Sequence, residues 1–170
     1  MPAARRSLVA VAQLLAVGCL ACQPPSADVG AANKEVVRAM YAAIDAQDYD
    51  RLDQLVAEDF ALHYVGVLEP LGKEAAFELI RTFYGAFPDY EHVVHEMIAE
   101  GDRVAVKLTY TGTQQGEFEG IAPTGNRISY EGAQIVTVAD GAIKELWALE
   151  DMLGSMSQLG MQLVPAEQGT

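Results

Sequence analysis

The hydrophobic pattern changes its period partway along the chain. Over residues 33–47 and 73–86, apolar side chains recur at three- and four-residue spacing, which predicts two amphipathic helices. Asn33 is suited to cap the first of them, and Asp50 to cap a short helix between the two. Pro88 follows the later helix and is expected to end it. The first half of the chain therefore predicts three helices.

Beyond Pro88 the pattern alternates with period two, which is typical of strands. Gly101-Asp102 and Asp140-Gly141 are two-residue hairpin signals between such segments. The predicted strands cover residues 60–65, 91–100, 103–111, 127–138 and 142–151. This order predicts an α+β fold with three N-terminal helices packed on a curved antiparallel sheet. The concave space between these layers would form a conical pocket for a small molecule.

The first residues have the features of an export signal. Arg5 and Arg6 precede an apolar run over 8–17, which is shorter than the about 20 residues that a membrane-spanning helix needs. Small residues follow, and the segment ending in Cys19 resembles a bacterial lipobox, whose cysteine is acylated. An ordinary cleaved signal peptide is the alternative. We therefore expect an exported protein of the bacterial cell envelope, attached to the membrane only by a lipid on Cys19.

The domain organisation follows from these patterns. Residues 1–22 are predicted to be the signal peptide with its lipobox-like cysteine. The stretch 23–32 contains proline, serine and glycine and is expected to be a flexible tether. Residues 33–163 then form one folded domain, and 164–170 form a tail.

The amino-acid composition of the chain limits the kinds of partner that it can bind. Hydrophobic residues make up 51% of the chain, which is enough for a core. The formal net charge of -13 excludes a phosphate backbone as a favourable partner, so we expect no nucleic acid. The 2 cysteines, Cys19 and Cys22, both lie in the leader. The domain body therefore has no residues for a disulfide or a thiolate metal site.

Several segments of the body together resemble a known family. They are Phe87-Pro88-Asp89, Gly101-Asp102, the glycine-rich loop 112–126, Asp140-Gly141 with the following Glu145, Trp147 and Asp151, and Gln158-Leu159-Gly160. In this order and spacing they resemble the SnoaL-like polyketide cyclases, or ester cyclases. That family has the cone-shaped fold of nuclear transport factor two and ketosteroid isomerase. The resemblance implies an intramolecular aldol condensation that uses an acidic pocket residue and no metal or cofactor. The matching acid is Asp151.

The residues around Asp151 fit that role if the last strand alternates regularly. Glu145, Trp147, Leu149 and Asp151 would then share one face. A carboxyl beside tryptophan and leucine is poorly solvated, which raises its pKa and suits it to general acid/base catalysis. Without the resemblance, an aspartate at a strand end is more typical of a solvated turn.

Three further residues are candidates for ligand binding. Gln134 falls on an apolar strand face and would bind either a ligand carbonyl or a backbone group. His63 lies on the strand face opposite to Phe60, and would polarise a substrate oxygen or be a packed, hydrogen-bonded histidine. Trp147 would form the apolar wall of the pocket or part of the core. His92 and His95 would point to opposite faces of a strand, so no metal site is predicted.

Three functions fit these features. The first is a cyclase-type acid/base enzyme that acts on an apolar or carbonyl-containing small molecule. The second is a non-catalytic lipoprotein that binds a small molecule in the same pocket. The third is a scaffold that forms a homodimer through the open face of its sheet, which exposed apolar residues on that face would favour.

Overall fold

The computed structural model describes residues 27–162 and 164. The predicted signal peptide, its Cys19 and the tail beyond 164 lie outside the described residues. Within that part, the elements follow one another in the order α1 (Ala27–Asp45), α2 (Tyr49–Leu55), β1 (Val56–Tyr64), α3 (Lys73–Ala86), β2 (Glu91–Glu100), β3 (Arg103–Thr113), β4 (Arg127–Ala139), β5 (Ala142–Glu150) and α4 (Met152–Gln158).

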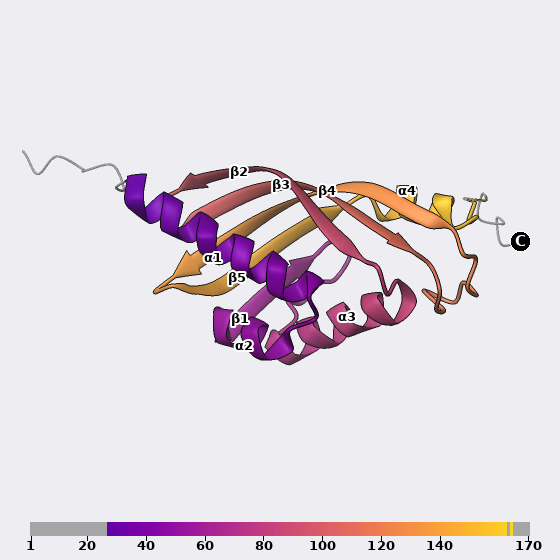
Figure 1. Ribbon diagram of the computed structural model, residues 1–170, viewed down its shortest axis with the longest axis horizontal. Coiled ribbons are helices and arrows are strands. Elements are labelled where there is room, and N and C mark those ends of the chain that lie inside the picture. The colour runs from indigo at the N-terminus through magenta and orange to yellow at the C-terminus, as the bar shows by residue number, and fades with distance from the viewer. Residues whose placement is uncertain (1–26, 163, 165–170) are drawn as a thin grey trace, which may run out of the picture.

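The predicted α+β architecture is confirmed. The five strands form one curved sheet in the order β1-β5-β4-β3-β2. All neighbours pair antiparallel except β1 and β5, which are parallel. Helices α1, α2 and α3 cover one face of the sheet, while α4 lies at one end, as Figure 1 shows. None of the helices within the described residues combines the length and apolar character that crossing a bilayer requires.

Two helix starts differ from the prediction. Helix α1 begins at Ala27 rather than at Asn33, so residues 27–32 are helical and not part of a flexible tether. Asn33 is buried inside the helix, where its Nδ2 donates to the carbonyl oxygen of Gly101 at 3.2 Å and so fastens α1 to the β2–β3 turn. Helix α2 is capped by Asp48, whose Oδ1 accepts from the Arg51 N–H at 3.0 Å, and not by Asp50.

Strand β5 contains an extra residue that changes its alternation. Val138 of β4 pairs with Ile143, but the preceding Thr137 pairs with Glu145. Lys144 therefore has no partner on β4 and forms a β-bulge. Such a bulge reverses the faces of all residues that follow it along the strand.

The bulge overturns the predicted faces of β5. Beyond it, Leu146 and Ala148 are buried on the inner face, toward the helices, and Glu150 lies on that face with them. Trp147 and Leu149 instead point outward, with 53% and 61% of their surface exposed. The sequence prediction had these two sets of residues on the wrong sides of the sheet.

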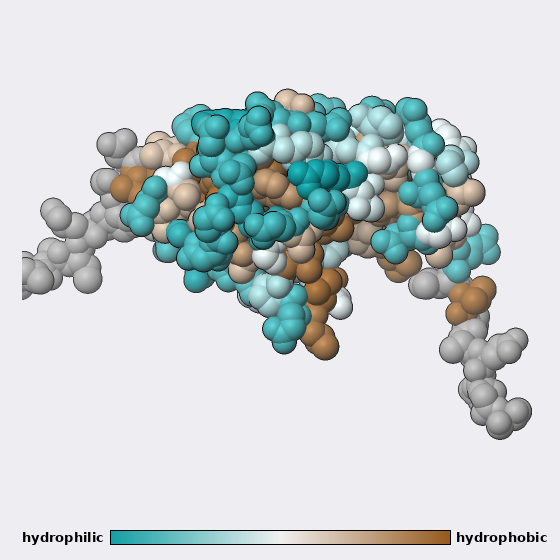
Figure 2. All heavy atoms as spheres, turned by 90° about the horizontal axis from the view of Figure 1, so that it is seen from below, coloured by the Kyte–Doolittle hydropathy of each residue, from teal (hydrophilic) through white to brown (hydrophobic). Residues whose placement is uncertain are grey.

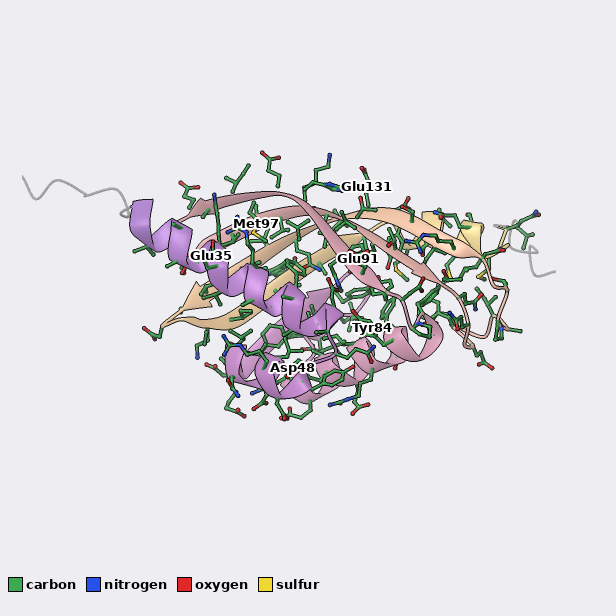
Figure 3. All side chains as sticks on the ribbon, viewed as in Figure 1. Glu35, Asp48, Tyr84, Glu91, Met97 and Glu131 are labelled. Carbon is green, nitrogen blue, oxygen red and sulfur yellow. The ribbon has the colours of Figure 1, made fainter. Side chains whose placement is uncertain are left out.

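The outer face of the sheet carries a row of side chains that runs across all five strands. By strand pairing the row consists of His63, Trp147, Ile135, Ala105 and Ile98, and we call it the outer-face row. Trp147, Ile135 and Ile98 are exposed. Figure 3 shows Glu131, also from β4, pointing away from the helices on this side of the sheet.

The loop between β3 and β4 is held by one buried glutamine. The Nε2 of Gln114 donates to the carbonyl oxygen of Ile121 at 3.1 Å. Its Oε1 accepts from the main-chain N–H of Thr124 at 3.1 Å and from the Thr124 hydroxyl at 2.7 Å. Because Gln114 is fully buried, these bonds satisfy its polar atoms and fix the loop at the end of the core.

Candidate active site

A cavity of about 100 Å³ lies between helices α1 to α3 and the inner face of the sheet. Its apolar lining consists of Met40, Ile44, Leu52, Val56, Phe60, Leu62, Ala76, Phe77, Leu79, Ile80, Phe83, Leu146 and Ala148. Its polar lining consists of Tyr41, Tyr64, Tyr84, Tyr90, His92, Tyr110, Gln134 and Glu150. Figure 2 shows the molecule from the side of the helices that enclose this cavity. The surface on this side is mostly hydrophilic, with hydrophobic residues between the hydrophilic ones.

Glu150 is the carboxylate of the cavity. It is the last residue of β5 and reaches the inner face because of the bulge at Lys144. The hydroxyl of Tyr64 donates to its Oε2 at 2.9 Å. Burial raises the pKa of the Glu150 carboxyl, while hydrogen bonds from Tyr64 and Tyr110 and the charge of His92 act in the opposite direction. The net result is a carboxyl whose pKa lies above its ordinary value, as general acid/base catalysis requires.

Gln134 joins the hydroxyls of two cavity tyrosines by hydrogen bonds. Its Oε1 accepts from the Tyr41 hydroxyl at 2.7 Å, and its Nε2 donates to the Tyr110 hydroxyl at 2.7 Å. The Tyr110 hydroxyl in turn lowers the pKa of the Glu150 carboxyl. Burial raises the pKa of both tyrosines far above the ordinary range, so both remain protonated. Gln134 thus lies in the cavity on the predicted face, and its contact with a ligand stays a prediction.

Gly132, which lies on β4 two residues before Gln134, packs against the ring of Tyr110. A side chain at Gly132 would place its first carbon 2.5 Å from Cε2 of Tyr110 and 3.1 Å from the carbonyl oxygen of Leu149. The Tyr110 ring therefore occupies the space that a side chain would take. Its position, and with it the shape of the cavity, depends on glycine at this point of β4.

His92, which lines the cavity, is paired with an aspartate, Asp45. Nδ1 of His92 lies 2.6 Å from Oδ1 of Asp45, and the main-chain N–H of His92 donates to the same oxygen at 3.3 Å. The hydroxyl of Tyr84 also donates to it, at 3.2 Å. These contacts join β2 to the C-terminal end of α1 and to α3. Figure 3 shows Tyr84 between the helices and the sheet.

The prediction that Asp151 is the pocket acid is wrong. Asp151 follows β5 and is exposed, and its Oδ1 accepts from the Gly154 N–H at 2.8 Å as the N-cap of α4. The reason is the bulge, because one extra residue in β5 turns Glu150 inward. The carboxyl that the cavity contains is thus the immediate neighbour of the expected one.

His63 and Trp147 also lie away from the cavity. Their rings stack on the outer face of the sheet, with centroids 4.0 Å apart and planes 2° apart. Nε2 of His63 lies 3.0 Å from Oε1 of Glu145. Neither residue lines the cavity, so the structure places these two predicted ligand contacts on the opposite side of the sheet. For His63 the alternative of a packed, hydrogen-bonded histidine describes what is observed.

The sequence prediction missed Glu150, Asp45 and His92. For Glu150 a local signal exists, because Ile143 and Leu146 are three positions apart, a spacing that regular alternation cannot place on one face. For Asp45 and His92 there is none, since only the packing of α1 against β2 brings them together. Among the described residues, no group of three or more histidine, cysteine, aspartate or glutamate side chains is arranged to hold a metal ion.

Fold and cavity together define an α+β domain with a carboxyl group in the wall of its cavity, and comparison identifies its family. The chain matches the SnoaL-like polyketide cyclase family over residues 34–159, and it belongs to that family. It is 31% identical over 133 residues to the aklanonic acid methyl ester cyclase DnrD of Streptomyces peucetius, covering 74% of this chain and 89% of that protein.

Solved structures agree with this assignment. AclR of Streptomyces galilaeus, a proposed hydroxylase, is 30% identical and superimposes with a TM-score of 0.72 over 81% of this chain and 91% of its own. A proposed SnoaL-like polyketide cyclase from Jannaschia Sp. CCS1 is 27% identical, with a TM-score of 0.74 over 83% of this chain and 99% of its own. Relatives with this fold thus carry names for different reactions.

Proposed function

We propose that this protein is a cofactor-independent cyclase-type enzyme that closes a ring in a small carbonyl compound, with Glu150 as its acid/base group. The observation that supports this most is the position of Glu150, a partly buried carboxyl with a raised pKa at the wall of a cavity lined mostly by apolar side chains. Such a group holds a proton more readily than an ordinary carboxyl and can take it up and return it during a reaction. Glu150 replaces Asp151 in the proposed role.

The proposed reaction is an intramolecular aldol condensation. The Glu150 carboxylate removes a proton from a carbon next to a carbonyl, and the resulting enolate carbon attacks a second carbonyl of the same molecule. A new carbon–carbon bond closes the ring, and the oxygen of the attacked carbonyl takes up a proton. The Tyr64 hydroxyl, 2.9 Å from Oε2, fixes the orientation of the carboxyl. The relative's name supplies a substrate to test, a polyketide methyl ester.

The test uses the full chain, purified in detergent, with aklanonic acid methyl ester as the probe. Ring closure is followed by chromatography, because the step as written loses no water and its substrate and product therefore have the same mass. We expect turnover by the wild type and none above background by Glu150→Gln. Binding of the probe without turnover would overturn the enzyme proposal and leave a small-molecule-binding protein. Equal turnover by Glu150→Gln would remove Glu150 from the reaction.

We further propose that the protein is exported and held at the membrane by a lipid on Cys19. The support is the sequence alone, namely the apolar run over 8–17 and the lipobox-like segment that ends in Cys19. Cells that express the full chain are fed an alkyne-labelled fatty acid, and incorporation is compared between Cys19→Ala and Cys22→Ala. Label lost only in Cys19→Ala supports the proposal. Label absent from the wild type would indicate an ordinary cleaved signal peptide.

The outer-face row supports a further proposal, that two copies pair through their sheets. Trp147, Ile135 and Ile98 are exposed on that face, where a second copy would bury them. Sedimentation of the wild type and of Trp147→Ser tests this. A dimer that dissociates in the variant supports the proposal, and a monomeric wild type at micromolar concentration contradicts it.

A further inference from the structure

We propose that His92 is a second acid/base group of this cavity and that Asp45 is its positioning residue. The inference rests on the proposed ring closure and adds a group to it. In this scheme Glu150 acts on the carbon that becomes the nucleophile, while His92 acts on the oxygen of the carbonyl that is attacked.

The geometry of the imidazole leaves one nitrogen for a ligand. Nδ1 is occupied by Asp45 at 2.6 Å, and a carboxylate at this distance favours the form in which Nδ1 carries a proton. Nε2 has no hydrogen-bond partner among the described residues, although the ring lines the cavity. This nitrogen is therefore free to accept a proton from a ligand or to donate one to it.

The ring is held by aromatic neighbours as well as by Asp45. Its centroid lies 5.4 Å from that of Tyr41, 5.4 Å from that of Tyr90 and 5.2 Å from that of Tyr110, the last two edge-on. The His92 side chain is only 10% exposed. An imidazole fixed in this way does not have to be oriented when a substrate arrives, which is the condition for efficient proton transfer.

His92 belongs to a series of polar groups along the inner face of the sheet. Four neighbouring strands each contribute one polar side chain to the cavity wall: Glu150 from β5, Gln134 from β4, Tyr110 from β3 and His92 from β2. His92 and Tyr110 are direct partners in the β2–β3 pairing. Two proton-transfer groups thus lie at the two ends of this series, with hydrogen-bonding groups between them. A substrate with two carbonyls matches that arrangement.

The protons balance over one turnover. Glu150 starts as a carboxylate and His92 as an imidazolium. Glu150 takes the proton of the C–H bond, whose electron pair forms the enolate. The enolate carbon bonds to the second carbonyl carbon, and the π pair of that carbonyl moves to its oxygen. His92 then gives its Nε2 proton to this oxygen. A proton passes from Glu150 through water to His92 and restores both groups, with no net proton gain or loss.

The alternative is that His92 and Asp45 only tie α1 to β2. The two roles differ in the partial reactions. Proton removal by Glu150 exchanges the acidic C–H of the substrate with solvent, and this step does not require His92 in our scheme. Ring closure requires both groups. Loss of a purely structural tie would distort the cavity and lower the two rates together.

The test compares these two rates in D₂O with aklanonic acid methyl ester and full-length protein. Deuterium in the unreacted substrate reports exchange, and product formation reports closure. For His92→Gln we expect exchange within about threefold of wild type and closure slowed at least about 100-fold, the usual lower bound for a general acid/base. For His63→Gln, the outer-face histidine that also pairs with a carboxylate, both rates should equal those of wild type.

Asp45→Asn provides a second variant with a spectroscopic readout. An asparagine amide can donate to Nδ1, so the neutral ring should change from the Nδ1–H to the Nε2–H form, which ¹⁵N chemical shifts of the histidine ring distinguish. Closure should fall at least about tenfold with exchange retained. Both rates falling equally, closure unchanged in His92→Gln, or a neutral wild-type ring that carries its proton on Nε2 rather than on Nδ1 would each overturn the inference while Glu150 keeps its role. A wild type that shows neither exchange nor closure would instead overturn the proposed function, and this inference with it.

Discussion

Each face of the sheet carries one histidine paired with a carboxylate, and the two pairs differ in every other respect. On the inner face, His92 and Asp45 are 10% and 27% exposed, and the ring touches the cavity. On the outer face, His63 and Glu145 are 25% and 35% exposed, and the ring stacks on the exposed Trp147. Residue type alone therefore does not identify the reactive pair.

The environment makes the difference. Solvent screens the charges of a pair at the surface, and such a pair contributes about 0–1 kcal/mol to stability. It also has no enclosed ligand on which it could act. Groups in an apolar cavity keep strong mutual interactions and have shifted proton affinities, as the raised pKa of Glu150 illustrates. Comparable substitutions at residues on the two faces can test this contrast.

The largest expected effect comes from two adjacent carboxyls at the end of β5. Glu150→Gln should lower ring closure by about 10²–10⁴-fold, because it removes the proton-transfer group from the cavity. Asp151→Asn should leave closure within about twofold of wild type, since asparagine is also a good N-cap for α4. Initial rates and thermal unfolding of both variants are the measurements. Loss of closure in Asp151→Asn instead would show that the acid lies where alternation alone predicts it.

The next effect concerns stability. Gln134→Leu removes the partner of the Tyr41 and Tyr110 hydroxyls, and buried hydroxyls without partners cost about 1–3 kcal/mol each in unfolding free energy. Glu131→Gln, on the outer face of the same strand, should change the unfolding free energy by less than about 0.5 kcal/mol. Urea denaturation monitored by tryptophan fluorescence measures both. Similar losses in the two variants would contradict the contrast between the faces.

A smaller effect depends on pH. Burial raises the pKa of Glu150 in the folded state above its unfolded value, so the folded protein binds this proton more tightly. The stability that results is complete below the unfolded pKa of about 4.3 and is lost as the pH rises through the folded pKa. The unfolding free energy of wild type should therefore fall relative to Glu150→Gln over that interval. Denaturation midpoints from pH 4 upward test the sign, and a constant difference would mean that Glu150 is solvated.

The smallest effect is expected for the outer histidine. His63→Gln should change the unfolding free energy by no more than about 1 kcal/mol, the upper range for a solvent-screened pair. The stacking on Trp147 can persist in part with a planar amide. Denaturation at low and high salt separates the electrostatic part, which salt should reduce. A loss of several kcal/mol would show that the outer face is buried in solution, as pairing between copies would require.

The sequence predicts the elements better than it predicts their faces. Helix α3 begins and ends where its apolar period does, at Lys73 and Ala86, and the β2–β3 turn falls at Gly101-Asp102. Both depend on local signals, namely side-chain period and turn chemistry. The early start of α1 at Ala27 was missed because its first turns lack the apolar stripe that marks the rest.

The candidate site was harder to predict for two physical reasons. A bulge at Lys144 adds one residue, and the spacing of Ile143 and Leu146 is a weak sign of it, because the exposed Trp147 and Leu149 alternate as regularly as buried residues do. The pair of Asp45 and His92 joins residues that are far apart in sequence, through the packing of a helix on an edge strand. Gln134 was placed correctly because no irregularity separates it from its apolar neighbours Val136 and Val138.

The bulge at Lys144 also has an evolutionary consequence. The side chain at this position points away from the cavity toward Asp59, whose Oδ1 it bonds at 2.7 Å, so many substitutions there leave the reacting groups in place. Deletion of the same single codon would instead exchange the faces of the strand beyond it, bringing Trp147 inward and turning Glu150 outward. Lineages that gained or lost this one residue would carry their acid at neighbouring alignment columns. To trace the reactive carboxyl among relatives, an alignment must therefore take account of insertions and deletions in this strand, because residue conservation at a single column would miss it.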